Sequence, residues 1–314
     1  CYRMVGSVAD AEDLVQETFL RAWRSRAAFE GRSLFRTWLY RIATNVCLNA
    51  LERTPRRTMP QDVASPVTTE SDWSDPPFEP PWKHELPWLQ PFPDRMLEPV
   101  AARETEPEAA VVARETIELA YLAALQHLPA QQRAILILSD ALDWSAKETA
   151  ELLETSVASV NSRLQRARAT MRVHLPARER DELPGTVPTD EERGVLRRFM
   201  HAWEHADADA LVAMMCEDIR WAMPPAPLWF DGRATIAKLL ERFPLRLQGD
   251  IRMLPTAANR QPAAASYHRA PGAAEYRLVA LNVLRVERGE IVELTTFSPS
   301  LLHGFDLPAS LSDR

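Results

Sequence analysis

The sequence has few of the residues that build metal sites or disulfide frameworks. Its three cysteines, Cys1, Cys47 and Cys216, lie far apart, and none belongs to a Cys-x-x-Cys or a Cys/His pair. A disulfide scaffold and a zinc site are therefore not indicated, and we expect neither a metal nor a cofactor. Reduced, mostly buried thiols are the expected state of all three cysteines.

Long hydrophobic runs are also missing. No segment approaches the roughly 18 consecutive apolar residues of a membrane span, and no secretory signal precedes the first predicted helix. We therefore expect a cytoplasmic protein without a membrane partner. The chain starts at Cys1, already inside helical sequence, so we expect an N-terminal piece to be missing.

Positive charge is scarce overall but locally concentrated. The net charge is -7, yet residues 1–60 hold ten arginines against six acidic residues, whereas residues 61–107 hold three basic and ten acidic residues. Acidic residues are absent between Glu154 and Glu179, an interval that contains five arginines. This distribution favours local basic surfaces, while the weak overall potential limits unaided affinity for DNA.

Residues 143–172 have the pattern of a helix-turn-helix. Ser145 and Glu148 form a capping box, and Ser156 caps a second helix whose apolar residues recur at helical spacing. Three polar residues lie in the early turns of that helix: Ser159, Ser162 and Arg163. Such side chains suit a DNA major groove, where polar groups meet base edges and arginines meet phosphates. The alternative is a solvated amphipathic helix, because arginine is a good helix former.

Two amphipathic helices are predicted before the helix-turn-helix. The first spans residues 9–26, with Asp10 as its cap, and its buried face is expected to contain Leu14, Val15, Phe19, Ala22 and Trp23. The second spans about residues 33–52 and carries a separate line of polar and aromatic residues: Trp38, Arg41, Asn45 and Asn49. An aromatic ring, a guanidinium and amides on one face suit the binding of unpaired bases. The alternative is that Trp38 belongs to the core.

Composition divides the rest of the chain. Twelve of the 25 prolines lie between residues 55 and 107, so this segment is predicted to be an extended linker, with its aromatic part at residues 86–94 docked on a surface. Helical patterns return at residues 108–127 and 130–139. After a second proline-containing linker, helices precede four strand candidates, which predicts a separate α+β domain.

Taken in order, these motifs resemble an RNA polymerase sigma factor of the extracytoplasmic function (ECF) group. Residues 10–23 are similar to the family's polymerase-binding helix, and residues 36–45 to its promoter-melting helix for the minus-ten element. Residues 128–133 and 159–168 resemble its domain that recognises the minus-thirty-five element. The tail resembles the SnoaL-like cone fold, through Trp203, Trp221 and a Phe-Asp-Gly-Arg turn before a helix.

The resemblance implies a multidomain chain with two all-α sigma domains and an α+β SnoaL-like cone domain. The expected segments are a sigma2 domain, a Pro/Trp-rich linker, a sigma4 domain, a second linker and a regulatory domain, at residues 1–57, 58–107, 108–176, 177–188 and 189–314. The implied partners are core RNA polymerase and promoter DNA. A small-molecule ligand of the C-terminal domain is left open.

The resemblance also assigns roles to individual residues. Polymerase contact is expected from Asp13, Gln16, Glu17 and Arg21. Contact with the minus-ten element is expected from Arg36, Trp38, Arg41 and Asn45. Contact with the minus-thirty-five element is expected from Ser159, Ser162, Arg163, Arg166 and Arg168. Candidates for lining a pocket in the tail are Trp203, Trp221 and Asp231.

Two other functions stay open. Relatives of the cone fold include cyclases and epoxide hydrolases, and His201, His205, Asp231 and Trp221 are candidates for a catalytic pocket. No pair of titratable groups has a recognisable spacing, so we expect a tail that is not an enzyme. A ligand-sensing transcription regulator explains the helix-turn-helix but not the helices within residues 10–52. The tail is expected to regulate the sigma domains, with a sign that the sequence does not predict.

Overall fold

The computed structural model describes residues 1–29, 31, 34–73, 86–97, 117–175, 188–245 and 249–312. They belong to two compact units, one built from residues 1–57 and 103–184 and the other from residues 58–102 and 185–314. The start of the predicted helix 108–127 and almost all of the second linker lie outside the described residues. Within the described residues, no helix is long and apolar enough to cross a membrane.

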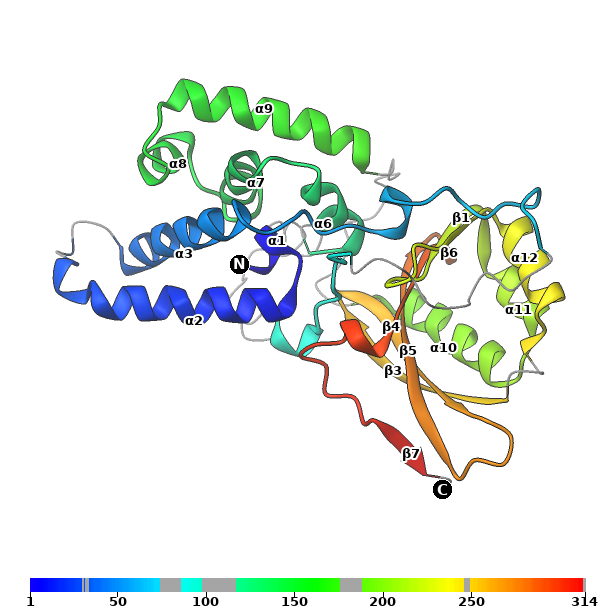
Figure 1. Ribbon diagram of the computed structural model, residues 1–314. Helices are drawn as coiled ribbons and strands as arrows, with labels where there is room; N and C mark the ends of the chain where they lie inside the picture. Colours follow the sequence, from blue (N-terminus) through cyan, green and yellow to red (C-terminus); the bar gives the residue numbers. More distant parts are fainter. Residues whose placement is uncertain are drawn as a thin grey trace. The chain divides into compact units, whose positions relative to one another are not determined.

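The first unit opens with a helical hairpin. Its elements are α1 (Tyr2–Val5), α2 (Val8–Arg24), the 3-10 turn η1 (Arg26–Ala28) and α3 (Phe35–Leu51). α2 and α3 run side by side (Figure 1). The cap of α2 is Ser7, whose Oγ accepts from the Asp10 backbone N–H at 3.2 Å, so the prediction that Asp10 is the cap is wrong. Asp10 instead lies in the first turn, where its charge is favoured by the helix dipole.

The buried face of α2 also differs from the prediction. Ala22 is buried as predicted, and Ala11 is buried as well, whereas Val15, Phe19 and Trp23 are 41%, 57% and 66% exposed. The main neighbour of α2 is a single helix, α3, and it covers only part of the apolar surface of α2. A stripe of large apolar side chains is therefore left in solvent.

The helix-turn-helix of the first unit follows the predicted pattern. The helices are α6 (Leu119–Gln126), α7 (Ala130–Leu136), the π-helical turn η4 (Ile137–Ala141), α8 (Ala146–Leu152) and α9 (Val157–His174). The Ser145–Glu148 capping box and the Ser156 cap are confirmed. Ala150 packs in a small core with Ile135 and Val160, where its small side chain lets α8 and α9 approach closely.

In its described residues, the second unit combines a mostly antiparallel sheet with three α-helices. Its helices are α10 (Asp190–Glu204), α11 (Ala208–Ala213) and α12 (Arg233–Arg242). Its strands are β1 (Met215–Ala222), β2 (Trp229–Asp231), β3 (Asp250–Ala258), β4 (Gln261–Arg269), β5 (Glu275–Glu287), β6 (Glu290–Phe297) and β7 (Ser310–Ser312). The order is β2-β1-β6-β5-β4-β3, with β7 beside β5 and a parallel pair formed by β1 and β6. The predicted α+β domain is confirmed.

The core of this unit lies between the helices and the sheet. Figure 1 shows α10, α11 and α12 together on one side of the strands. Phe199 of α10, Ile219 of β1, Leu239 of α12 and Leu294 of β6 are all buried in one cluster. The helices therefore cover a sheet face that would otherwise be apolar and exposed, which is the usual reason for a two-layer α+β arrangement.

The described part of the proline-rich segment packs on the second unit. Val67 extends the sheet beside β2, donating its N–H to Trp229 O at 2.9 Å and accepting from Asp231 N–H at 3.2 Å. Farther along, Phe92 and Asn259 are joined by two hydrogen bonds of 2.8 and 2.9 Å. The expected docking of the aromatic part is thus observed, and its surface is the C-terminal domain. The limits of the linker stay predictions.

Candidate nucleic-acid interface

The predicted minus-ten residues lie on α3. Arg41 and Asn45 are exposed, and Trp38 is half-buried, with ring centroids of Phe29 and Phe35 at 5.1 and 5.7 Å. Helical spacing places Trp38, Arg41 and Asn45 along one line, called here the melting line. Arg36 is exposed near the start of the helix, where its guanidinium lies 5.4 Å from the Tyr40 ring centroid.

Helix α8 and the turn after it occupy part of the melting line. The Arg41 Nη2 donates to Glu154 Oε1 at 3.1 Å and to the Glu151 carbonyl at 3.2 Å. A cavity of about 150 Å³ next to this contact is lined by Trp38 and Arg41 from α3 and by Leu152 from α8, among others. A nucleic acid strand that binds the Arg41 Nη2 therefore competes with the Glu154 carboxylate for this atom.

The predicted minus-thirty-five residues lie on α9 and divide into two groups. Four of them follow a spacing of three, one and three residues and share one face, called here the α9 face: Ser159, Ser162, Arg163 and Arg166. Arg163 donates to Gln131 Oε1. The fifth, Arg168, lies on a different side of α9 and holds Asp140 through bonds of 2.6 and 3.2 Å. These bonds raise the pKa of Arg168, and the structure does not bring it to the α9 face.

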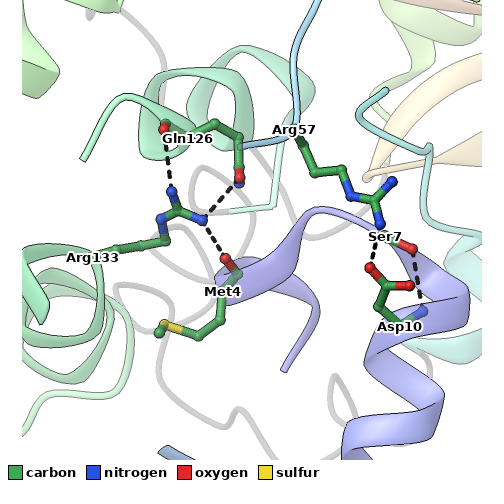
Figure 2. Close-up of polar contacts among 6 residues, drawn as sticks. All are labelled: Met4, Ser7, Asp10, Arg57, Gln126 and Arg133. Carbon is green, nitrogen blue, oxygen red and sulfur yellow. Dashed lines mark hydrogen bonds and ion pairs between the residues drawn. The ribbon is translucent and has the colours of Figure 1, made fainter. Parts of the chain in front are cut away.

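A buried arginine joins the two helical parts of the first unit. Arg133 is 4% exposed, and its guanidinium donates to the Met4 carbonyl, to Gln126 Oε1 at 2.9 Å, and to the Gln126 and Leu128 carbonyls at 3.2 Å (Figure 2). Burial lowers the pKa of Arg133 to about 10, with a smaller contribution from nearby Arg56. The charge is therefore retained at neutral pH and satisfied by oxygen atoms from both parts.

An ion pair supports the same region. The Arg57 Nη2 donates to Asp10 Oδ2, so the segment after α3 is tied to the first turn of α2 (Figure 2). Sequence patterns did not reveal these contacts, because nothing local distinguishes a buried arginine from a solvated one.

The predicted polymerase-binding residues lie on the solvent side of α2. Asp13, Gln16 and Arg21 are exposed, and Glu17 is half-buried and pairs with Arg21 at 2.6 Å. Such exposed pairs contribute little stability, which leaves these side chains available to a partner.

The same helix has a functional candidate that sequence reasoning missed. Phe19, Leu20 and Trp23 are more than half exposed, although Phe19 and Trp23 were expected in the core. Contiguous exposed apolar side chains commonly mark a protein interaction surface. The available signal was the width of the apolar arc of α2, which exceeds what one neighbouring helix can cover.

The second unit contains a cavity of about 480 Å³. Trp203 of α10 and Trp221 of β1 line it, as predicted for a tail pocket, whereas Asp231 is exposed on β2 and does not line it. His201 and His205 are exposed on α10 and lie against each other, with ring centroids 3.9 Å apart, and neither lines the cavity. Among the described residues, no group of three or more His, Cys, Asp or Glu could hold a metal ion.

Comparison with known proteins agrees with this architecture. Residues 1–57 match Sigma-70 region 2, residues 118–171 match Sigma-70 region 4, and residues 196–294 match a SnoaL-like domain. The ECF RNA polymerase sigma factor SigG of Mycobacterium tuberculosis (strain H37Rv) is 40% identical over 314 residues, covering 99% of this chain and 80% of that protein. The chain belongs to the ECF RNA polymerase sigma factors.

Further relatives of this ECF sigma factor support the assignment. SigW of Bacillus subtilis (strain 168) is 31% identical over 176 residues, which is 56% of this chain and 80% of that protein. The crystal structure of the Mycobacterium tuberculosis ECF sigma factor SigJ covers 98% of this chain and 94% of its own, with a TM-score of 0.59 and 22% identity, and so shows a shared fold. The chain is a sigma factor of RNA polymerase, which rules out an ordinary transcription regulator.

Proposed function

We propose that the melting line of α3 holds the unpaired non-template strand of the minus-ten element. This proposal rests on three side chains that follow one another along one side of α3. They are the aromatic ring of Trp38, the guanidinium of Arg41 and the amide of Asn45. Trp38 is braced by Phe29 and Phe35, which lowers the entropic cost of stacking a base on its ring. Base stacking on an aromatic side chain contributes roughly 1–3 kcal/mol, and the Asn45 amide can hydrogen-bond a base edge.

The α9 face is proposed to bind the minus-thirty-five element as duplex. Its short serines allow close approach to base edges, and Arg163 and Arg166 can bind phosphates or guanine. Arg168 is proposed to act differently from these residues. Because it holds Asp140, it positions α9 against the preceding helices and neutralises a carboxylate near the DNA.

Polymerase binding is assigned to the exposed side of α2. The predicted polar residues lie beside the exposed Phe19, Leu20 and Trp23, and such a combination of exposed apolar and polar side chains is typical of protein interfaces. A chain with a net charge of -7 gains little affinity for DNA by itself. The polymerase is therefore proposed to supply most of the affinity in the cytoplasm, and the sigma factor to supply promoter choice.

The SnoaL-like domain is proposed to be regulatory, with its cavity as the site of a small-molecule ligand. Catalysis is disfavoured because, among the described residues that line the cavity, His268 is the single titratable side chain. General acid–base catalysis needs a proton-transfer group in reach of the reacting atoms, and commonly a second group with a separate pKa. A regulatory role agrees with the packing of the proline-rich segment on this domain.

Run-off transcription from a genomic promoter library tests the sigma assignment of α3. Core polymerase with the full chain should give specific transcripts that disappear with Trp38→Ala and with Asn45→Ala. Asn161→Ala, an exposed asparagine on α9 that lies outside both the melting line and the α9 face, is the matched control and should retain them. Transcripts that persist in both variants would contradict the role of the melting line. Deleting the tail is a less clean test, because it removes the surface on which residues 58–73 and 86–97 pack.

A further inference from the structure

Helix α12 lies between the cavity and the proline-rich segment. On one side, Leu239, Leu240 and the adjoining Phe243 line the cavity of the SnoaL-like domain. On the other side, Lys238 and Arg242 bind the segment that leads away from the sigma2 domain. A helix of ten residues that forms one wall of a cavity and also holds a connecting segment can respond to both.

The hold on the connecting segment is specific and involves side chains of α12 and β2. The Lys238 Nζ donates to the Thr69 carbonyl at 2.6 Å and lies 5.3 Å from the Trp73 ring centroid, in a cation–π contact. The Arg242 Nε donates to the Trp73 carbonyl at 3.4 Å. Trp73 itself packs against the main core. The Trp229 indole N–H donates to the Ala64 carbonyl at 2.9 Å, so residues 64–73 are held at both ends.

A directional hydrogen-bond chain defines the polar part of the cavity. The Trp221 indole can only donate, and it donates to Thr296 Oγ1 at 2.8 Å. The Thr296 hydroxyl then donates to Asn282 Oδ1 at 2.8 Å, which leaves the Asn282 amide nitrogen to donate to Ser266 Oγ at 2.8 Å. Ser266 accepts in this chain, so its own hydroxyl hydrogen is available. Because Ser266 lines the cavity, this hydrogen can be donated to a ligand.

The remaining walls limit the class of ligand. Apolar and aromatic side chains dominate the described part of the lining, where Asp, Glu, Lys and Arg are absent and the titratable side chain is that of His268. The indole N–H of Trp203 has no hydrogen-bond partner within the described part of the chain, but its nitrogen is buried and does not reach the open cavity. The Ser266 hydroxyl, in a described lining that is mostly apolar and holds no Asp, Glu, Lys or Arg, favours a neutral, mostly apolar molecule with an acceptor oxygen.

We propose that this cavity binds a neutral apolar molecule bearing an acceptor oxygen, and that α12 couples its occupancy to the hold on residues 64–73. A ligand in the cavity gives Leu239, Leu240 and Phe243 contacts that they lack when the cavity is empty, and so fixes α12. When α12 is held in place, Lys238 and Arg242 stay in position to donate to the Thr69 and Trp73 carbonyls. A bound ligand should therefore strengthen the contacts that hold residues 64–73. The regulatory consequence rests on the proposed function, because this segment connects the sigma domains.

Thermodynamic reciprocity gives the proposal a sharp test. If a bound ligand strengthens the contacts between α12 and residues 64–73, those contacts must strengthen ligand binding by the same factor. A variant that weakens the contacts should therefore lower the affinity for the ligand. The probe is prodan, a neutral naphthalene ketone whose fluorescence depends on polarity, added to the full chain. Saturable binding is expected in the wild type, and Ala280→Phe, which fills the cavity from β5, should remove it. Ala280→Leu is a milder second variant that should weaken binding.

The coupling between cavity occupancy and the connecting segment is then measured by hydrogen exchange in residues 64–73. Bound prodan should slow amide hydrogen exchange of the peptide that covers residues 64–73, and this protection should be absent in Ala280→Phe. Lys238→Met, which keeps the side-chain stem and does not line the cavity, should reduce prodan affinity about two- to fivefold. Glu241→Gln, an exposed change on the same helix, is the control and should leave the affinity unchanged.

Three results would overturn the proposal. The first is that prodan shows no saturable binding, or binding that neither Ala280 variant alters. The second is prodan binding without any change in exchange at residues 64–73. The third is equal prodan affinity in the wild type and Lys238→Met. None of these readouts involves transcription, so a failure here is distinct from a failure of the sigma function, which run-off transcription measures separately.

Discussion

The melting line of α3 and the α9 face both carry polar residues, but they differ in how far those side chains are already bound by other parts of the protein. The α9 face starts at a capped helix end, lies on a small packed core, and keeps Ser162 and Arg166 in solvent. On α3, Trp38 is packed among aromatic rings and Arg41 is bound to Glu154. The difference fits their proposed partners, since duplex DNA is present before melting, whereas an unpaired strand arises later.

This contrast teaches that residue spacing reports which side chains share a face but not whether that face is accessible. The same limit applies to α2, where the apolar residues have helical spacing yet remain exposed. Four variants test how α3 and the helix-turn-helix differ, and they follow in order of decreasing expected effect.

Arg133→Met removes the contact that holds both surfaces in one unit. The Met4, Gln126 and Leu128 carbonyls would lose their shared donor, and leaving buried acceptors unsatisfied costs about 1–3 kcal/mol. The free energy of unfolding measured in urea should therefore fall by about 2–3 kcal/mol. Arg172→Met, an exposed change on α9, should stay within about 0.5 kcal/mol of the wild type. Equal losses for the two variants would contradict the account of Arg133.

Arg166→Ala should specifically weaken the binding of the α9 face to the minus-thirty-five duplex. A base or phosphate contact is worth about 1–3 kcal/mol, so the affinity of the holoenzyme for a minus-thirty-five duplex should fall about tenfold. Arg168→Ala should reduce that affinity less, because its guanidinium is already bound to Asp140. Fluorescence anisotropy at fixed salt measures both. A larger loss for Arg168→Ala would place it on the DNA and remove the distinction drawn here.

Glu154→Gln should release Arg41 from its partner in the first unit. Exposed pairs of this kind contribute about 0.2–1 kcal/mol, so affinity for an unpaired minus-ten strand should rise by up to about fivefold. Glu151→Gln is the matched control, since Glu151 contacts Arg41 through its backbone carbonyl. If both variants bind the strand alike, the carboxylate does not compete with DNA.

The smallest effect concerns the capping box of α8. Hydrogen bonds from the Ser145 hydroxyl and N–H lower the pKa of Glu148 below its usual value of 4.5. The box therefore stabilises the folded state above about pH 4.5 and loses this contribution as pH falls through the lower, folded-state pKa. The difference in Tm between the wild type and Glu148→Ala should shrink on acidification from pH 6 to pH 3. A constant difference would show that the carboxylate charge is not involved.

Much of the fold could be predicted because its signals are local. The caps Ser145 and Ser156 and the strands of the tail follow from neighbouring residues, and the structure has them close to the predicted places. The α2 cap was misplaced because Asp10 and Ser7 both suit a helix start, and backbone geometry decides between them.

Long-range contacts could not be predicted in the same way. The pairing of Arg41 with Glu154 joins residues 113 positions apart, and the hold of Lys238 on Thr69 spans 169 positions. Each depends on which surfaces meet after folding, and neither partner has an unusual neighbourhood in the sequence. The sequence therefore predicted candidate residues for the site, but it did not predict the contacts that these residues make with distant parts of the chain.

The most direct test of the account compares two DNA fragments with the wild-type holoenzyme and two variants. One fragment carries the minus-thirty-five element as duplex, and the other exposes the non-template minus-ten strand unpaired. We expect Trp38→Ala to lose about tenfold in affinity for the unpaired strand, in line with roughly 1–3 kcal/mol per stacked base, and to keep its affinity for the duplex. Arg166→Ala should show the opposite pattern. Loss on both fragments in either variant, or on neither, would contradict the division of labour between α3 and α9.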